Sequence, residues 1–133
     1  MIAADTNILV RVFHHDDPAQ VEAVRGLLTG ASARDPVLVT NIVLAEFCWV
    51  MGRLYKHPKG FIVDCLNALM VSFEIAFEDA QAVQMALKVY SEEPRADFAD
   101  CLVAAVAQRE GARTTYTFDK IAARNADMTY LAH

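Results

Sequence analysis

Short apolar runs alternate with longer helical segments along the chain, and this alternation constrains the fold more than any other feature. Five runs have the composition of strands, at residues 2–5, 37–40, 73–77, 114–117 and 128–131. Strands that alternate with helices indicate a parallel sheet with helices on both faces. The expected fold is therefore α/β, with three layers (α/β/α) and a central, mostly parallel sheet of about five strands.

Seven helices are expected between these strands. Asp16-Asp17-Pro18 marks a helix start, since an N-cap residue precedes proline, and Asn41 is the expected cap of the third helix. The expected helices cover residues 8–13, 18–30, 42–56, 59–70, 79–90 and 97–110, and a short one follows Asp119. No linker or repeat divides the 133 residues, which predicts one domain over 1–133.

Five acidic residues stand beside apolar residues at the ends or edges of these segments. Their apolar neighbours predict that all five lie at the edge of a core, where an unpaired carboxylate is costly. Because ligands bind beyond the carboxyl ends of strands in open α/β sheets, the five are expected to converge on one edge. They are Asp5, Glu46, Asp97, Asp100 and Asp119.

A shared divalent cation is the simplest partner for such a cluster. Carboxylate oxygens suit Mg²⁺ or Mn²⁺, whereas zinc would call for His or Cys ligands. Such a site can support in-line attack of water on a phosphodiester. Each acid also has a simpler explanation, because Asp5 and Asp97 can cap helices and Asp119 can be a turn residue.

The overall charge decides little about nucleic-acid binding. The net charge is −5, but without the five acids the 17 acidic residues fall to 12, which equals the number of Lys and Arg residues. The chain thus lacks the strongly basic surface of non-specific nucleic-acid binders.

A hydrophobic fraction of 55% predicts a subunit or partner interface, on the helices near 44–55 and 61–70.

Cysteine usage and hydropathy indicate the compartment. Cys48, Cys65 and Cys101 lack metal-ligand spacing and are expected to be reduced and buried. No apolar run reaches the length of a membrane span, and no secretory signal is evident at the start. A cytoplasmic protein that does not enter a membrane is expected.

Four motifs in order resemble those of PIN-domain ribonucleases, in particular the VapC-type toxins of bacterial toxin–antitoxin pairs. They are Ile2–Arg11 with Asp5-Thr6-Asn7, Leu44–Trp49 around Glu46, Ala96–Ala105 around Asp97 and Asp100, and Tyr116–Lys120 around Asp119. The resemblance runs nearly end to end and implies a PIN-like α/β fold.

The resemblance also implies roles for individual residues. Asp5, Glu46, Asp100 and Asp119 would be the catalytic, metal-binding acids, with Asp97 as an additional metal ligand. Thr6 and Asn7 would shape the first turn, and Thr117 would support the site. Candidate phosphate contacts near the rim are Arg11, Arg53, Arg95 and Lys120, together with Lys56, Lys59 and Arg124.

The implied activity is a Mg²⁺-dependent endoribonuclease, with Mn²⁺ as a possible substitute, that cleaves single-stranded or looped RNA. The implied partners are a cognate antitoxin protein and a second copy of the chain in a homodimer. Two alternatives remain at this point. One is a small Mg²⁺-dependent phosphatase or receiver domain, although Asn7, Thr40 and Thr117 stand where these would need other residues. The other is an RNA-binding or regulatory scaffold with this fold and no cleavage.

Overall fold

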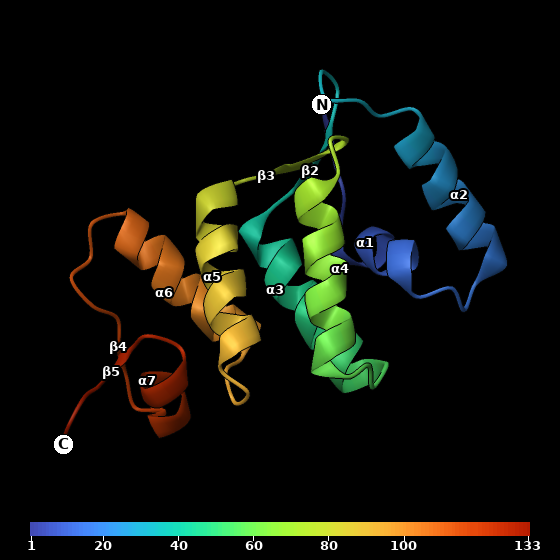
Figure 1. The fold of residues 1–133 in the computed structure, drawn as a ribbon. Coiled ribbons are helices and arrows are strands. Elements are labelled where there is room, and N and C mark those ends of the chain that lie inside the picture. Colours follow the sequence, from blue (N-terminus) through green and yellow to red (C-terminus); the bar gives the residue numbers. More distant parts are fainter. The chain divides into compact units, whose positions relative to one another are not determined.

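The computed structural model describes all 133 residues, which divide into two compact units, 1–78 and 79–133 (Figure 1). The α/β class expected from the sequence is confirmed. The five expected strands are present, but they do not form one sheet. The first three strands pair in one parallel sheet. The last two hydrogen-bond only to each other and form a second parallel sheet.

The sheet of the first unit has the order β1-β2-β3, all parallel. Its strands are β1 (Ile2–Ala3), β2 (Val37–Val39) and β3 (Ile75–Phe77). Ile2 is opposite Val37, and Val37 is in turn opposite Ile75. Val37 and Val39 on the central strand are completely buried, whereas β3 is an edge strand, as its alternating sequence predicts.

Five helical elements connect these strands. They are α1 (Thr6–Phe13), α2 (Pro18–Thr29), α3 (Asn41–Trp49), the π-helix η1 (Val50–Leu54) and α4 (Lys59–Val71). The start of α2 is as expected, since the Asp17 carboxylate accepts from the Gln20 N–H at 3.1 Å and Pro18 opens the helix. Leu9, Val10, Leu44, Phe47 and Met51 form much of the buried core.

Two details of the helix starts differ from the expectation. Thr6 and Asn7 belong to the first turn of α1 and not to a preceding turn, because Asp5 already acts as its N-cap. The cap of α3 is Thr40 and not Asn41, since the Thr40 hydroxyl accepts from the Val43 N–H at 3.4 Å. Asn41 instead donates its backbone N–H to the Glu78 carboxylate at 2.9 Å.

The second unit contains a helix pair and a small sheet. The helices α5 (Ala80–Glu92) and α6 (Phe98–Arg109) pack against each other, with the rings of Tyr90 and Phe98 at 5.6 Å. The helix α7 (Lys120–Asn125) packs on the parallel strands β4 (Tyr116–Thr117) and β5 (Thr129–Tyr130).

Cysteines and hydropathy bear on the remaining expectations. Cys48, Cys65 and Cys101 are buried and form no disulfide bond, as expected. Burial raises the pKa of the Cys65 thiol to about 11. None of the helices combines the length and the apolar character that a membrane crossing requires.

Candidate active site

Asp5 lies between the end of β1 and the start of α1 and is the N-cap of that helix. Its carboxylate accepts a hydrogen bond from the Thr6 N–H at 2.7 Å, and its carbonyl accepts from the N–H groups of Ile8 and Leu9. These bonds satisfy donors at the start of α1 and fix the place of the carboxylate. The Asp5 side chain is nevertheless exposed, so it has coordination positions left for another partner.

The first unit brings Asp5 and Glu46 together. Both line a pocket of about 310 Å³ between α1 and the α3–η1 helix, where Thr6, Asn7 and Arg11 also lie. The Thr6 hydroxyl oxygen is buried in this region and has no hydrogen-bond partner. A buried hydroxyl without a partner is unusual and calls for an explanation such as an ion or a water.

Arg11 lines the same pocket, but its guanidinium is already engaged. Its Nε donates to Gln20 Oε1 at 2.8 Å and its Nη2 to the Tyr55 hydroxyl at 3.5 Å. Its Nη1 lies 3.1 Å from an Asp16 carboxylate oxygen. The hydrogen bond to Tyr55, followed by the charge of Asp16, raises the pKa of Arg11 above its usual value despite some desolvation.

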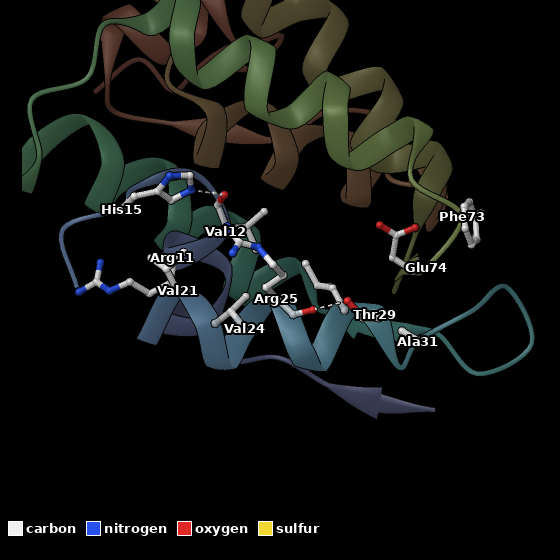
Figure 2. A pocket seen from close by; sticks show the side chains of 11 residues that line it. Arg11, Val12, His15, Val21, Val24, Arg25, Thr29, Ala31, Phe73 and Glu74 are labelled. Atoms are coloured by element: carbon white, nitrogen blue, oxygen red, sulfur yellow. Dashed lines mark hydrogen bonds between the residues drawn. The ribbon is translucent and has the colours of Figure 1, made fainter. Parts of the chain in front are cut away.

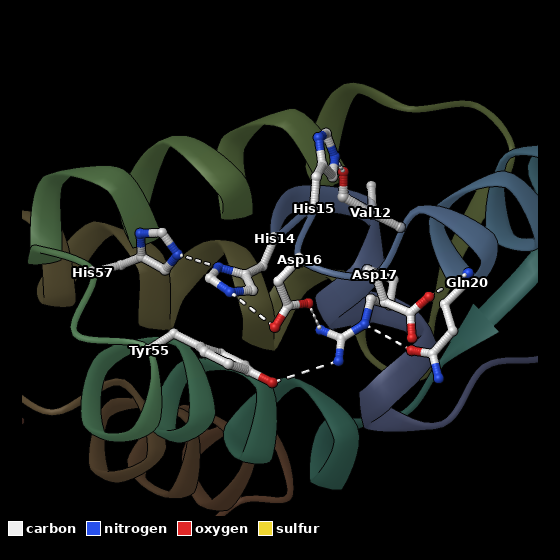
Figure 3. A network of polar contacts seen from close by, with 9 residues as sticks. Val12, His14, His15, Asp16, Asp17, Gln20, Tyr55 and His57 are labelled. Atoms are coloured by element: carbon white, nitrogen blue, oxygen red, sulfur yellow. Dashed lines mark hydrogen bonds and ion pairs between the residues drawn. The ribbon is translucent and has the colours of Figure 1, made fainter.

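Two histidines, His14 and His57, extend this network (Figure 3). His14 Nε2 lies 3.5 Å from Asp16, and its Nδ1 shares a hydrogen bond of 2.9 Å with His57 Nε2. The His14 ring stacks on Tyr55 at 3.9 Å. Sequence reasoning missed Tyr55, Gln20 and His57, because these contacts depend on how separate segments of the chain pack and no local pattern signals them.

A second pocket of the first unit, of about 490 Å³, lies between α1, α2 and the segment before β3 (Figure 2). Arg11, His15 and Arg25 supply its basic groups, and Val12, Val21, Val24 and Leu28 its apolar surface. Glu74 is its only acid. It lacks the oxygen-rich character of the Asp5–Glu46 pocket and is therefore a poorer place for a cation.

The second unit holds the other three acids. Asp97 caps α6 by accepting from the Ala99 N–H at 2.8 Å, and Asp100 lies in the first turn of the same helix. Asp119 caps α7 by accepting from the N–H groups of Ile121 at 2.8 Å and Ala122 at 3.1 Å. The Asp119 N–H in turn donates to the Thr117 hydroxyl at 3.0 Å, which ties Thr117 to the start of α7.

These three acids influence one another. Burial raises the pKa of Asp100 above its usual value, and the negative charges of Asp97 and Asp119 raise it further. The negative charges of Asp97 and Asp119 thus disfavour the ionised form of Asp100. Asp100 is half-buried, and the other two are exposed.

The expectation that all five acids lie at a core edge is wrong for four of them. Asp5, Glu46, Asp97 and Asp119 are exposed, and only Asp100 is partly buried. Helical geometry explains the error at Glu46. Neighbours in a helix point about 100° apart, so Phe47 is fully buried while Glu46 beside it faces solvent.

The donor set of the first unit fits a magnesium ion. No group of three or more His, Cys, Asp or Glu side chains is arranged to hold a metal ion. Mg²⁺ does not need such a cage, since one or two carboxylates usually hold it and waters and substrate phosphates complete its shell. Asp5 and Glu46 provide two carboxylates, and Thr6 a spare hydroxyl. The convergence of all five acids on one site stays a prediction.

The other candidate residues are exposed cations. Arg53 lies on η1, Arg95 in the loop between α5 and α6, and Lys120 at the start of α7. None of the three forms an ion pair with a carboxylate, in contrast to Arg11. Their charges remain available to an anionic ligand.

Comparison with known protein families gives a match over most of the chain. The family model described as PIN domain matches residues 2–128, a span that contains all five acids and nearly all of both compact units. No curated protein matches the chain closely enough to serve as a relative.

Proposed function

The chain belongs to the PIN domain family, and from this premise we propose that it is a Mg²⁺-dependent endoribonuclease that cleaves single-stranded or looped RNA. PIN domains are generally nucleases that use divalent metal ions. The observation that carries the proposal for this chain is the pocket in which Asp5, Glu46 and the unpartnered Thr6 hydroxyl lie together. Mn²⁺ is a possible substitute, because the same oxygen ligands suit it.

The proposed roles follow from where the residues lie. Asp5 and Glu46 would hold the ion, and the N-cap bond of Asp5 to Thr6 would keep its carboxylate oriented. Asp97, Asp100 and Asp119 would supply the remaining acidic positions. A bound divalent ion would activate the attacking water and neutralise charge on the phosphodiester. Thr6, Asn7 and Thr117 would support these acids.

The cations have two different proposed roles. Arg53, Arg95 and Lys120 would contact RNA phosphates, since they are exposed and unpaired. Arg11 would instead orient the pocket. Its bonds to Gln20 and Tyr55 would keep its charge near Asp5 and Glu46 without direct pairing to either acid.

A cleavage assay tests the proposal. Wild-type protein should cut a labelled single-stranded RNA with Mg²⁺ and fail to do so with EDTA. Asp5→Asn and Glu46→Gln should each reduce the rate at least about a hundredfold, because loss of a group that only hydrogen-bonds to a metal ligand already costs about 10–100-fold. Asp64→Asn, which neutralises an exposed acid on α4, is the matched control and should keep the wild-type rate.

The outcomes separate the possible functions. Wild-type cleavage by Asp5→Asn would refute the proposed chemistry. RNA binding without cleavage under any metal would favour the scaffold alternative. The phosphatase and receiver alternatives are set aside, because the family match is to PIN domains.

The physiological class and the partners are part of the proposal. We propose a VapC-type toxin that pairs with an antitoxin and forms a homodimer. Trp49 and Leu54 support the homodimer, since these two large apolar side chains are 59% and 60% exposed. Met51, Ile62 and Leu66, which lie in the two helical segments where an interface was expected, belong to the core. Light scattering at micromolar concentration tests the dimer, and a purely monomeric mass would remove it.

A further inference from the structure

A basic pocket lies between α7 and β5 in the second unit. It encloses about 590 Å³, and its lining residues are Lys120, Ala123, Arg124, Met128, Thr129 and Tyr130. Its volume is within the range of small-ligand sites. It starts directly beside Asp119, the residue that caps α7.

Two positive charges in this pocket have no acidic partner in the protein. Lys120 and Arg124 are both exposed, and neither forms an ion pair with a carboxylate. Four residues apart on one helix, they share a face and repel each other weakly. The neighbouring Asp119 forms no ion pair with either of them, and its carboxylate accepts from the Ile121 and Ala122 N–H groups. An anion in the pocket would remove the repulsion.

An aromatic ring and apolar side chains complete the pocket. The Lys120 ammonium lies 5.6 Å from the centroid of the half-buried Tyr130 ring, and Met128 and Ala123 provide apolar surface. Cations beside an aromatic ring are the combination with which proteins hold single-stranded nucleic acid. The cations follow the backbone, and the ring stacks on a base regardless of its identity.

We propose that this pocket is a subsite for one nucleotide of a single-stranded RNA, with its phosphate on Lys120 and Arg124 and its base on Tyr130. The proposal rests on the proposed function, since the pocket would bind the strand next to the scissile bond. Asp119 links the two, because it precedes Lys120 directly and belongs to the acidic group of this unit.

The test measures binding separately from cleavage. Fluorescence anisotropy with a labelled oligouridine decamer in EDTA gives the affinity of the full chain at several salt concentrations. Lys120→Ala/Arg124→Ala should weaken binding about tenfold. It should also flatten the plot of log affinity against log salt by about 0.7, the value for one phosphate contact with a single strand. Tyr130→Ala should weaken binding about tenfold, within the range for loss of one stacked base, without a change in this slope.

Three controls make the result specific. Arg34→Ala/Lys88→Ala removes the same charge from exposed positions elsewhere and should leave affinity nearly unchanged. The double variant Lys120→Arg/Arg124→Lys keeps both charges and should keep the slope. The loss of affinity in the double alanine variant is then attributed to the missing charges and not to a folding defect. Tyr130→Phe keeps the ring and should bind like the wild type.

The proposal is overturned if the wild-type chain does not bind the decamer, or if the two pocket variants bind it as the wild type does. An unchanged affinity in Tyr130→Ala alone would also overturn it, since a site for free phosphate has no need of the ring. The binding assay contains no metal, so its result does not depend on cleavage. Absence of cleavage in the separate activity assay would refute the proposed function and leave the nucleotide subsite standing. Normal cleavage would not support the subsite if the pocket variants bind the decamer as the wild type does.

Discussion

Among the five candidate acids, Asp100 is the one whose pKa is raised by its surroundings. Its pKa is raised by burial and by the charges of Asp97 and Asp119, so the folded chain binds its proton more tightly than the unfolded chain does. The favourable contribution is therefore fully present at a pH below about 3.9, the unfolded value, and is lost as the pH rises through the folded pKa.

Asp100→Asn should remove this pH-dependent loss. In EDTA, the variant should match the wild type at low pH and exceed its free energy of unfolding at neutral pH by roughly 0.5 kcal/mol, a small value because the group is partly solvated. Urea unfolding at several pH values measures the difference, with Asp64→Asn as the control. A difference that does not change with pH would argue against repulsion among the three acids.

For single residues, the sequence predicted the chemical role of a side chain better than its exposure to solvent. The N-cap role of Asp97 and the helix after Asp119 could be predicted from the sequence, because both depend on local chain geometry. Exposure was not readable at Asp5, since apolar neighbours such as Ala4 can be buried while the next side chain points to water. The contacts of Arg11 with Gln20 and Tyr55 depend on how α1, α2 and η1 pack, which no local pattern encodes.

Among the elements, α3 best shows how a local rule can choose the wrong residue. Asn41 and Thr40 are both good cap residues, and only the backbone decides between them. Thr40 has the extended conformation that a cap needs, whereas Asn41 is already helical and its side-chain oxygen is buried without a partner.

A pair of alanine variants tests this assignment. Thr40→Ala should lower the free energy of unfolding by about 1 kcal/mol, because it leaves the Val43 N–H without its acceptor. Asn41→Ala should change it by less than about 0.5 kcal/mol, since no side-chain hydrogen bond is lost. Chemical denaturation of both variants decides, and a larger loss in Asn41→Ala would reverse the assignment.

For the whole molecule, the open question is whether the two compact units fold as one domain. The sequence predicted a single domain over 1–133, and the family match spans both units. The order of strands and helices was predictable from periodicity. The separation into a three-stranded and a two-stranded sheet was not, because strand pairing is a long-range property that runs of two or three residues do not specify.

Unfolding followed by two probes tests the single domain. Trp49 is the only tryptophan and reports on the first unit, whereas far-UV circular dichroism reports on the helices of both. The two urea transitions should coincide, as expected for a small two-state domain. Separate midpoints would mean that the units unfold independently.

The π-helical turn η1 has a consequence for how this protein tolerates changes in length. A π-turn contains one residue more than an α-helical path would, and it rotates everything that follows. Deletion of Gly52 should restore α-helical winding, turn Tyr55 by about 100° and take its hydroxyl away from Arg11. The Arg11 side-chain NMR signals would report that loss. A relative one residue shorter here would thus have to orient its arginine differently, even with every side chain of the pocket retained.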